Sequence, residues 1–351
     1  MQTRLALLVA AAAALASLHP TDARAEGAPG EDPPEGRRVH GLRWMVFSGT
    51  KAVRSLPSVG PGVNRVGLGR YEVTFPGPEP NGNVQLSGYG GTPGTCNVGG
   101  WSAGAQDTTI DVRCYDGDGR PQDMGFALLH VIARDDPPNA ALAYGWLAAP
   151  TSSSPTAAYP MAYRSPGLPA PPRRVAPGTY HVVGRAGVGW GSQSVWFATG
   201  YGPTPRGCRG VSNPSFLGFQ CPRLDASRTA ADSMASFLVL HRSTLSPWAW
   251  PLRGAGGYAR FLGSGAPWGT VGTGRYDWMS NGGTIRATRE RAGRYEVRFP
   301  GVGDVKKEPG FALVSEGCRE VAMQDAGPDV VVAIDCGVDR DFDVAFVRMG
   351  V

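Results

Sequence analysis

Apolar and polar residues alternate in short runs along much of this chain. Positions 71 to 75 read Tyr-Glu-Val-Thr-Phe, so Tyr71, Val73 and Phe75 share one side and the polar residues share the other. Successive side chains of a β-strand point to opposite faces, and this period of two therefore predicts a half-buried strand. Pro76 and Gly77 predict its end, because proline cannot donate to a strand ladder.

This strand belongs to a motif that occurs three times. The shared skeleton is R-x3-G-x-Y-x-V, and its copies begin at Arg65, Arg174 and Arg289. The middle copy lacks the Phe-Pro-Gly that follows the other two and keeps the Gly, Tyr and Val. Such tolerance is typical of a packing element, and the motif therefore marks where the core of each repeat lies.

The three copies predict three repeats, each of about 100 residues with about six short strands. No segment of ten or more residues sustains the 3.6-residue period of a helix. We therefore expect an all-β fold of three tandem antiparallel β-sandwich or barrel-like repeats, each with one disulfide. The expected boundaries are 37–136 for the first segment, 137–242 for the second and 243–351 for the third.

The six cysteines support this division, because each segment holds two of them. The second cysteine of each pair ends an alternating apolar run, where a bond to the first would be buried. No C-x-x-C spacing occurs, so neither a zinc knuckle nor a thioredoxin motif is supported. Six cysteines allow fifteen pairings. We predict Cys96–Cys114, Cys208–Cys221 and Cys318–Cys336.

The first 25 residues read as a signal peptide. Arg4 precedes an apolar run that is too short to anchor the chain in a bilayer, and an A-x-A exit ends at Ala25. Residues 26–36 are acidic and proline-rich and read as a disordered lead. The prediction is therefore a secreted protein, extracellular or periplasmic, with no membrane span in the rest of the chain.

Composition agrees with many turns and a modest core. The 351 residues include 51 Gly and 31 Pro, and 42% are hydrophobic. The net charge is +5, and the basic residues are nearly all arginine. Because no run of five basic residues occurs, we expect no nucleic-acid partner.

The pattern of strands and cysteines resembles that of uncharacterised secreted repeat proteins of GC-rich bacteria, which carry G-x-Y-x-V strands and one Cys pair per unit. The residues that carry the resemblance, beside the six cysteines, are Gly69, Tyr71, Val73, Gly178, Tyr180, Val182, Gly293, Tyr295 and Val297. The resemblance implies the fold of the protein and its secretion, and it implies no catalytic activity.

Two groups of residues suggest catalysis. Residues 100–104 match the G-x-S-x-G nucleophile elbow around Ser102. The sequence after them reads as a turn and a strand, whereas the elbow needs a strand, a turn and a helix, so we expect an exposed glycine-rich loop. An acidic pair such as Asp116 and Asp123 is the other candidate for a hydrolase.

Three aspartates, Asp116, Asp118 and Asp123, have a spacing that could hold calcium, but Asp-Gly sequences also form ordinary hairpin turns. His130 and His241 occupy matching places in apolar strands, which favours packing over catalysis. Neither observation predicts a metal or a cofactor.

The aromatic residues and the recurrent arginine each allow two interpretations, one functional and one structural. Trp190, Trp196 and Tyr201 could stack on sugar rings, or they could fill small β cores. The recurrent arginine of the motif could bind a ligand, or it could pair with an acidic neighbour in its own repeat.

The sequence thus favours a secreted non-enzymatic β-repeat protein with a binding or structural role, toward extracellular polysaccharide or an envelope surface. The alternative is a secreted hydrolase that uses Ser102 or an acidic pair.

Overall fold

The computed structural model of the chain describes residues 41–58, 60–79, 82–132, 142–147, 161–164, 172–182, 194–213, 216–225, 227–241, 255–261, 269–271, 277–303, 310–315 and 317–348. The predicted signal peptide and lead lie outside these residues. So do the exact segment boundaries at 136/137 and 242/243, and Trp190.

Every regular element in the described part of the chain is a β-strand, which confirms the all-β class. The first segment contains β1 (Gly41–Phe47), β2 (Ala52–Leu56), β3 (Gly62–Gly67), β4 (Arg70–Pro76), β5 (Asn83–Tyr89), β6 (Thr95–Ala103), β7 (Asp107–Tyr115) and β8 (Gly125–Ile132). The second contains β9 (Leu142–Leu147), β10 (Met161–Arg164), β11 (Arg173–Ala176), β12 (Thr179–His181), β13 (Ser194–Gly200), β14 (Arg209–Asn213), β15 (Phe216–Gln220) and β16 (Ala235–His241). The third contains β17 (Ala255–Phe261), β18 (Gly269–Val271), β19 (Asp277–Met279), β20 (Arg286–Arg291), β21 (Arg294–Phe299), β22 (Gly310–Val314), β23 (Arg319–Ala326), β24 (Asp329–Asp335) and β25 (Phe342–Arg348). No described segment is a helix long and apolar enough to cross a bilayer.

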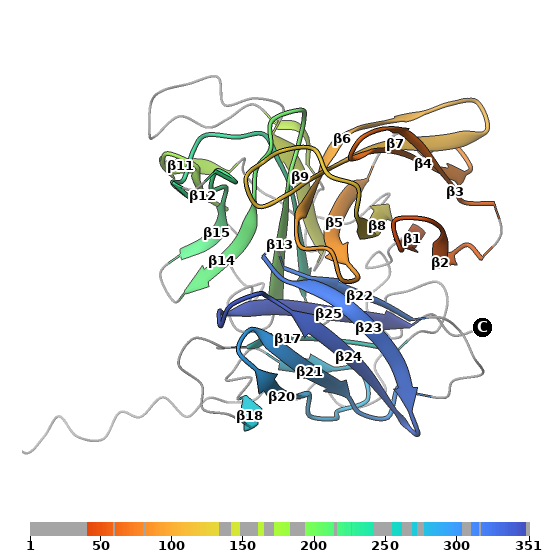
Figure 1. Cartoon of the computed structure of the whole chain (residues 1–351), viewed down its shortest axis with the longest axis vertical. Helices are drawn as coiled ribbons and strands as arrows, with labels where there is room; N and C mark the ends of the chain where they lie inside the picture. Colours follow the sequence, from red (N-terminus) through yellow and green to blue (C-terminus); the bar gives the residue numbers. More distant parts are fainter. Residues whose placement is uncertain are drawn as a thin grey trace, which may run out of the picture. The chain divides into compact units, whose positions relative to one another are not determined.

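The strands form five sheets (Figure 1). Four sheets have four strands, in the orders β3-β4-β7-β6, β10-β9-β16-β13, β11-β12-β15-β14 and β19-β17-β25-β22. The fifth has nine, in the order β18-β20-β21-β24-β23-β5-β8-β1-β2. This long sheet joins strands of the third segment to strands of the first through a short parallel contact between β5 and β23.

The motif strands occupy equivalent central places. β4 lies between β3 and β7, β12 between β11 and β15, and β21 between β20 and β24. Along β4 the burial alternates as the sequence predicted: Tyr71, Val73 and Phe75 are buried, and Glu72 is exposed. Tyr180 and Tyr295 are equally buried in the other two copies.

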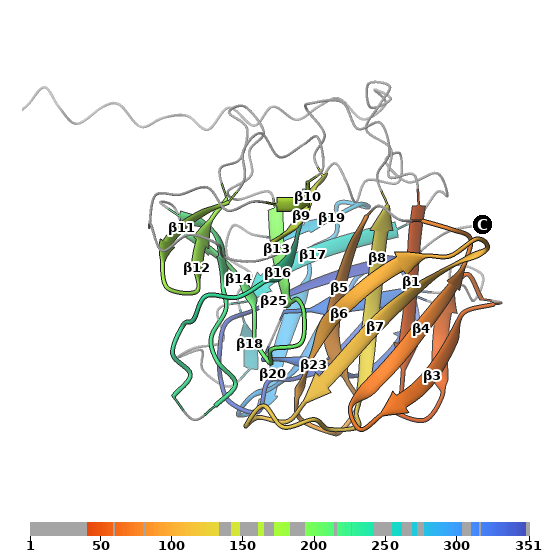
Figure 2. The ribbon, with the colours of Figure 1, turned by 90° about the horizontal axis from the view of Figure 1, so that it is seen from above.

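Each segment has its own hydrophobic core, drawn from two sets of strands. In the first segment, Met45, Phe47, Phe126 and Leu128 of β1 and β8 meet Tyr71 and other residues of β4 and β7. Figure 2 shows the sheet β3-β4-β7-β6 lying over β1, β8 and β5. The second and third segments have corresponding clusters around Tyr180 and Tyr295.

A fourth core is shared by all three segments. It contains Trp44 from the first segment, Phe197 and Leu238 from the second, and Phe311 and Val347 from the third, with their neighbours. The same strands thus place alternate residues into their own core and into the shared one. Burial on both faces explains why these strands are apolar almost throughout, as in the Phe-Ala-Leu-Leu-His-Val run of β8.

Ionic and polar contacts also join the segments. Arg54 of the first pairs with the buried carboxylate of Glu320 in the third. Burial raises the pKa of Glu320, and the charge and hydrogen bond of Arg54 oppose that rise. The amide of Gly90 donates to the carbonyl of Glu320 at 2.8 Å, beside the parallel contact of β5 and β23.

A buried polar network joins the first segment to the second. Asn83 donates to the hydroxyl of Ser236 at 2.9 Å, and Ser236 donates to the carbonyl of Val84 at 2.8 Å. The hydroxyl of Thr199 donates to Gln85 at 3.0 Å. Because buried polar groups are costly when unpaired, these bonds favour one mutual arrangement of β5, β13 and β16.

Two expectations were wrong. The first and second segments each contain eight described strands and the third contains nine, where about six were expected in each. One of them is β6, which contains residues 100–103 of the expected glycine-rich loop. The glycines of β6 interrupt its alternation of apolar and polar residues, which hid the strand, although it pairs with β7 along its whole length and buries Cys96 and Val98.

Candidate functional site

The recurrent arginine of the motif belongs to a network around an aspartate. In the first segment, Asp123 accepts hydrogen bonds from Arg65 at 2.7 Å, from the amide of Gly69 at 2.8 Å and from the hydroxyl of Tyr71 at 3.2 Å. The Tyr71 hydroxyl also accepts from the amide of Met124 at 3.2 Å. The network therefore joins the residues just before β8 to the start of β4.

The second segment repeats this network. Asp232 accepts from Arg174 at 2.7 Å and from the amide of Gly178 at 3.0 Å. Here Tyr180 bonds to the backbone of Ser233, next to the aspartate, and not to the aspartate itself.

The third segment repeats it as well. Asp339 pairs with Arg289, and it accepts from the amide of Gly293 at 2.8 Å and from Tyr295 at 3.0 Å. Arg65, Arg174 and Arg289 thus pair with acidic residues of their own segments, which was one of the two readings of the sequence.

These bonds hold the three carboxylates in their charged form. The hydrogen bond from Arg65 lowers the pKa of Asp123, and the amide of Gly293 lowers that of Asp339. Burial acts most strongly on the pKa of Asp232 and raises it, but the Arg174 and Gly178 bonds together lower the pKa below its usual value. Because these carboxylates are bonded within their own segments, we assign them a role in stabilising the fold.

The same glycines anchor the disulfides. The amide of the second cysteine donates to the motif glycine carbonyl in each segment, from Cys114 to Gly69 at 2.7 Å, from Cys221 to Gly178 at 2.8 Å and from Cys336 to Gly293 at 2.6 Å. The three disulfides join Cys96 to Cys114, Cys208 to Cys221 and Cys318 to Cys336. All six cysteines are buried, and each disulfide is part of the hydrophobic core of its own segment.

Ser102 is an exposed residue of β6, opposite Thr109 of β7. The segment is one arm of an antiparallel hairpin and continues through a turn into β7. It therefore lacks the strand–turn–helix junction that aims a nucleophile and its oxyanion amides.

Asp116 and Asp123 belong to separate hydrogen-bond networks. Asp116 accepts from the amides of Asp118 and Arg120, each at 2.9 Å, and closes the turn after β7. Asp123 belongs to the network of Arg65. Across the described residues, no group of three or more His, Cys, Asp or Glu side chains is placed to hold a metal ion.

The histidine and aromatic candidates lie mainly in cores. His130 is fully buried in β8, and Trp196 is buried in the core of the second segment. Tyr201 packs edge-on against Trp101 with 5.8 Å between ring centroids. The side chain of His241 lies outside the described part.

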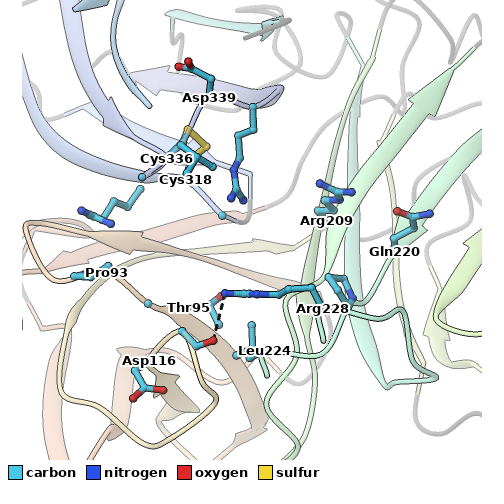
Figure 3. Close-up of a pocket in the computed structure, with 18 of the residues that line it drawn as sticks. Pro93, Thr95, Asp116, Arg209, Gln220, Leu224, Arg228, Cys318, Cys336 and Asp339 are labelled. Atoms are coloured by element: carbon cyan, nitrogen blue, oxygen red, sulfur yellow. Dashed lines mark hydrogen bonds between the residues drawn. A yellow bond between two sulfur atoms is a disulfide. The ribbon is translucent and has the colours of Figure 1, made fainter. Parts of the chain in front are cut away.

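A pocket of about 680 Å³ lies where turns and strand ends of the three segments meet. Figure 3 shows Thr95 and Asp116 on one side, Arg209 and Gln220 on another, and the disulfide Cys318–Cys336 on a third. The contributing parts are β6 with the turn after β7, the ends of β14 and β15, and the strand ends around the third disulfide.

The lining of this pocket carries more positive than negative charge. Four arginines line it, Arg209, Arg228, Arg319 and Arg340, against two aspartates, Asp116 and Asp339. Both carboxylates are already engaged, since Asp339 pairs with Arg289 and Asp116 accepts two backbone amides. Val338, which is 55% exposed, and buried Leu224 add apolar surface.

Reasoning from the sequence missed these arginines. One signal was present: the residue after the first cysteine of a pair is arginine in two segments, Arg209 and Arg319, and Asn97 in the first. Without knowledge that the three disulfide ends meet, nothing marks these positions as neighbours.

Comparison of the chain with protein-family models, with curated proteins and with solved structures gives no match.

Proposed function

We propose that this chain is an exported, non-enzymatic binding protein of three tandem two-sheet repeats, which holds an acidic saccharide of the extracellular or envelope surface in the pocket between its segments. The observation that carries the proposal is the charge of that pocket: Arg209 and Arg228 have no carboxylate partner among the described residues, and both aspartates of the lining are engaged.

Size and lining support a ligand of oligosaccharide dimensions. A volume of about 680 Å³ is within the usual range of small-molecule sites. Arginine is the side chain best suited to carboxylate and sulfate oxygens, because its donors form a rigid fork. Pro93, Pro222 and Val338 offer apolar surface to the C–H faces of sugar rings.

A nucleic-acid strand suits this pocket less well. Single-stranded bases are usually bound by stacking on aromatic side chains, and none of the described residues that line the pocket is aromatic. An acidic saccharide needs cations and apolar surface, and both are present.

Three features support export and a binding role. Three disulfides suit an oxidising compartment, outside the cytoplasm. The recurrent Arg–Asp–Gly network and the three segment cores favour three copies of one two-sheet unit. The hairpin around Ser102 and the separate bonds of Asp116 and Asp123 favour binding over hydrolysis.

The test is calorimetric titration of the purified full chain, disulfides intact, with oligogalacturonate, a sulfated oligosaccharide and a neutral glucan of similar length. We expect the acidic oligosaccharides to bind, more weakly as salt rises, and the neutral glucan not to bind. A reducing-end assay on the same mixtures should show no cleavage. Equal binding of all three, or no binding, would contradict the binding proposal, and cleavage would contradict the non-enzymatic one.

A further inference from the structure

The three segments place equivalent residue pairs near their disulfides, and these pairs differ. The residue after the first cysteine lies directly opposite the residue before the second cysteine. The three cross-strand pairs are Asn97 with Arg113, Arg209 with Gln220, and Arg319 with Asp335.

In the first and third segments, the arginine of this pair is bonded to a carboxylate of its own sheet. Arg319 bonds to Asp335 at 2.9 Å and to the carbonyl of Gly90 at 3.0 Å. Arg113 bonds to Asp111 at 2.8 Å, and buried Asn97 donates to the carbonyl of Thr204 at 2.8 Å. These arginines are therefore neutralised within their own sheets.

The second segment differs because Gln220, which stands opposite Arg209, carries no charge. Arg209 is exposed, and no carboxylate in the described part of the chain forms an ion pair with it. Figure 3 shows Arg209 and Gln220 side by side at the wall of the pocket. The guanidinium and the side-chain amide together offer hydrogen-bond donors on one wall.

Arg228 is a second cation that lines the pocket. It donates to the carbonyl of Gly117 at 3.3 Å, across from the second segment to the first, and has no carboxylate partner among the described residues. Its φ of 45° lies in the left-handed region, which non-glycine residues adopt uncommonly. The turn thus holds this arginine at the pocket at some conformational cost.

We propose that Arg209, with Gln220 beside it, binds the carboxylate or sulfate oxygens of the saccharide, and that the neutral side chain at position 220 is what leaves Arg209 available. This inference rests on the proposed function and deepens it. Of the three equivalent pairs, the second is the one whose arginine has no carboxylate partner among the described residues, so its charge is available to a ligand.

The experiment introduces into the second segment the pairing that the third already has. Gln220→Asp should neutralise Arg209 as Asp335 neutralises Arg319, and Arg209→Ala should remove the cation. Arg286→Ala is the matched control, since Arg286 is exposed in β20 and lies outside the pocket. Thermal melting of each variant checks the fold.

Oligogalacturonate, the sulfated oligosaccharide and inorganic phosphate serve as probes. We expect Gln220→Asp and Arg209→Ala to weaken oligosaccharide binding at least about tenfold, the factor for one charge-assisted hydrogen bond, with Arg286→Ala unchanged. Whichever oligosaccharide loses more affinity identifies the group bound by Arg209, and phosphate should bind far more weakly than either.

The outcomes separate the two proposals. Wild-type binding that both pocket variants retain would overturn the role of Arg209 and leave the proposed function standing. Equal losses in the pocket variants and in Arg286→Ala would show a diffuse charge effect and overturn it as well. No binding by the wild-type chain would overturn both.

Discussion

The guanidinium of Arg54 meets the buried carboxylate of Glu320, a residue 266 positions further along the chain. The side chain of Glu320 is fully buried and that of Arg54 is 12% exposed. This pair lies where the first segment meets the third, beside the parallel contact of β5 and β23.

Glu320→Ala should destabilise the protein by about 3 kcal/mol, because it leaves a nearly buried cation without its partner. The double change Arg54→Met with Glu320→Leu should come within about 1 kcal/mol of the wild type, since it removes both desolvated charges. Urea unfolding gives both values. A double variant as unstable as Glu320→Ala would contradict this account of the pair.

The three motif arginines should differ in their contributions to stability. Arg65 is 52% exposed in its pair with Asp123, whereas Arg174 and Arg289 are 11% exposed. Solvent screens the first pair, so Arg65→Ala should destabilise the protein less than Arg174→Ala. Arg174→Ala should cost about 1.5–3 kcal/mol, the range for a hydrogen bond to a charged group. Chemical denaturation compares them, and equal losses would argue against screening.

Gly69→Ala should be strongly destabilising. The φ of Gly69 is 63°, and an added Cβ would lie 2.4 Å from the carbonyl oxygen of Cys114. Left-handed strain and this clash together should cost at least about 2 kcal/mol. Gly67→Ala is the control, because its nearest contact would be 3.9 Å away, at Arg70. Similar melting temperatures for the two variants would contradict the argument.

Acid should weaken the protein through its three network aspartates. The pKa of each of Asp123, Asp232 and Asp339 is lower in the folded chain than its ordinary value. The unfolded chain then binds more protons, and stability falls with falling pH. This contribution is fully present above the ordinary aspartate pKa of about 3.9 and is lost as pH falls through the lower folded values.

Asp232→Asn should make the dependence of the unfolding free energy on pH shallower between pH 5 and 2, because one proton-linked group is gone. Asp118→Asn, in an exposed turn, serves as the control. Parallel curves for the wild type and Asp232→Asn would contradict the assignment.

Removing the second disulfide should cost about 3 kcal/mol in the chain-entropy model. The bond closes a loop with a sequence separation of 13, and both sulfurs are buried in the core of that segment. The Cys208→Ser and Cys221→Ser double variant tests this by calorimetry. A melting temperature equal to that of the wild type would contradict it.

Local patterns predicted those elements whose stability is local. The alternation around Tyr71 depends only on which face of one strand is buried, and the six cysteines pair within their own segments. The apolar run of β8 signalled a strand buried on both faces, although its second partner, the shared core, could not be inferred.

Long-range relationships were not predictable. The partner of Arg174, Asp232, lies 58 residues away, and the spacing from the second cysteine to this aspartate differs in every segment. β6 escaped detection because its glycines carry no period. The pocket with Arg209 and Gln220 exists only after the three disulfide ends have come together, and no single stretch of sequence contains it.

The shared core also sets the order in which the chain can fold. Trp44 of the first segment and Val347 of the third belong to the same cluster, so the shared core is complete only after the third segment has been made. Contacts of such sequence separation are slow to form, because a long loop must close before they stabilise anything. During synthesis, the first two segments therefore expose those apolar side chains of the shared core that pack against the third. A chaperone that covers this apolar surface should raise the yield of folded protein.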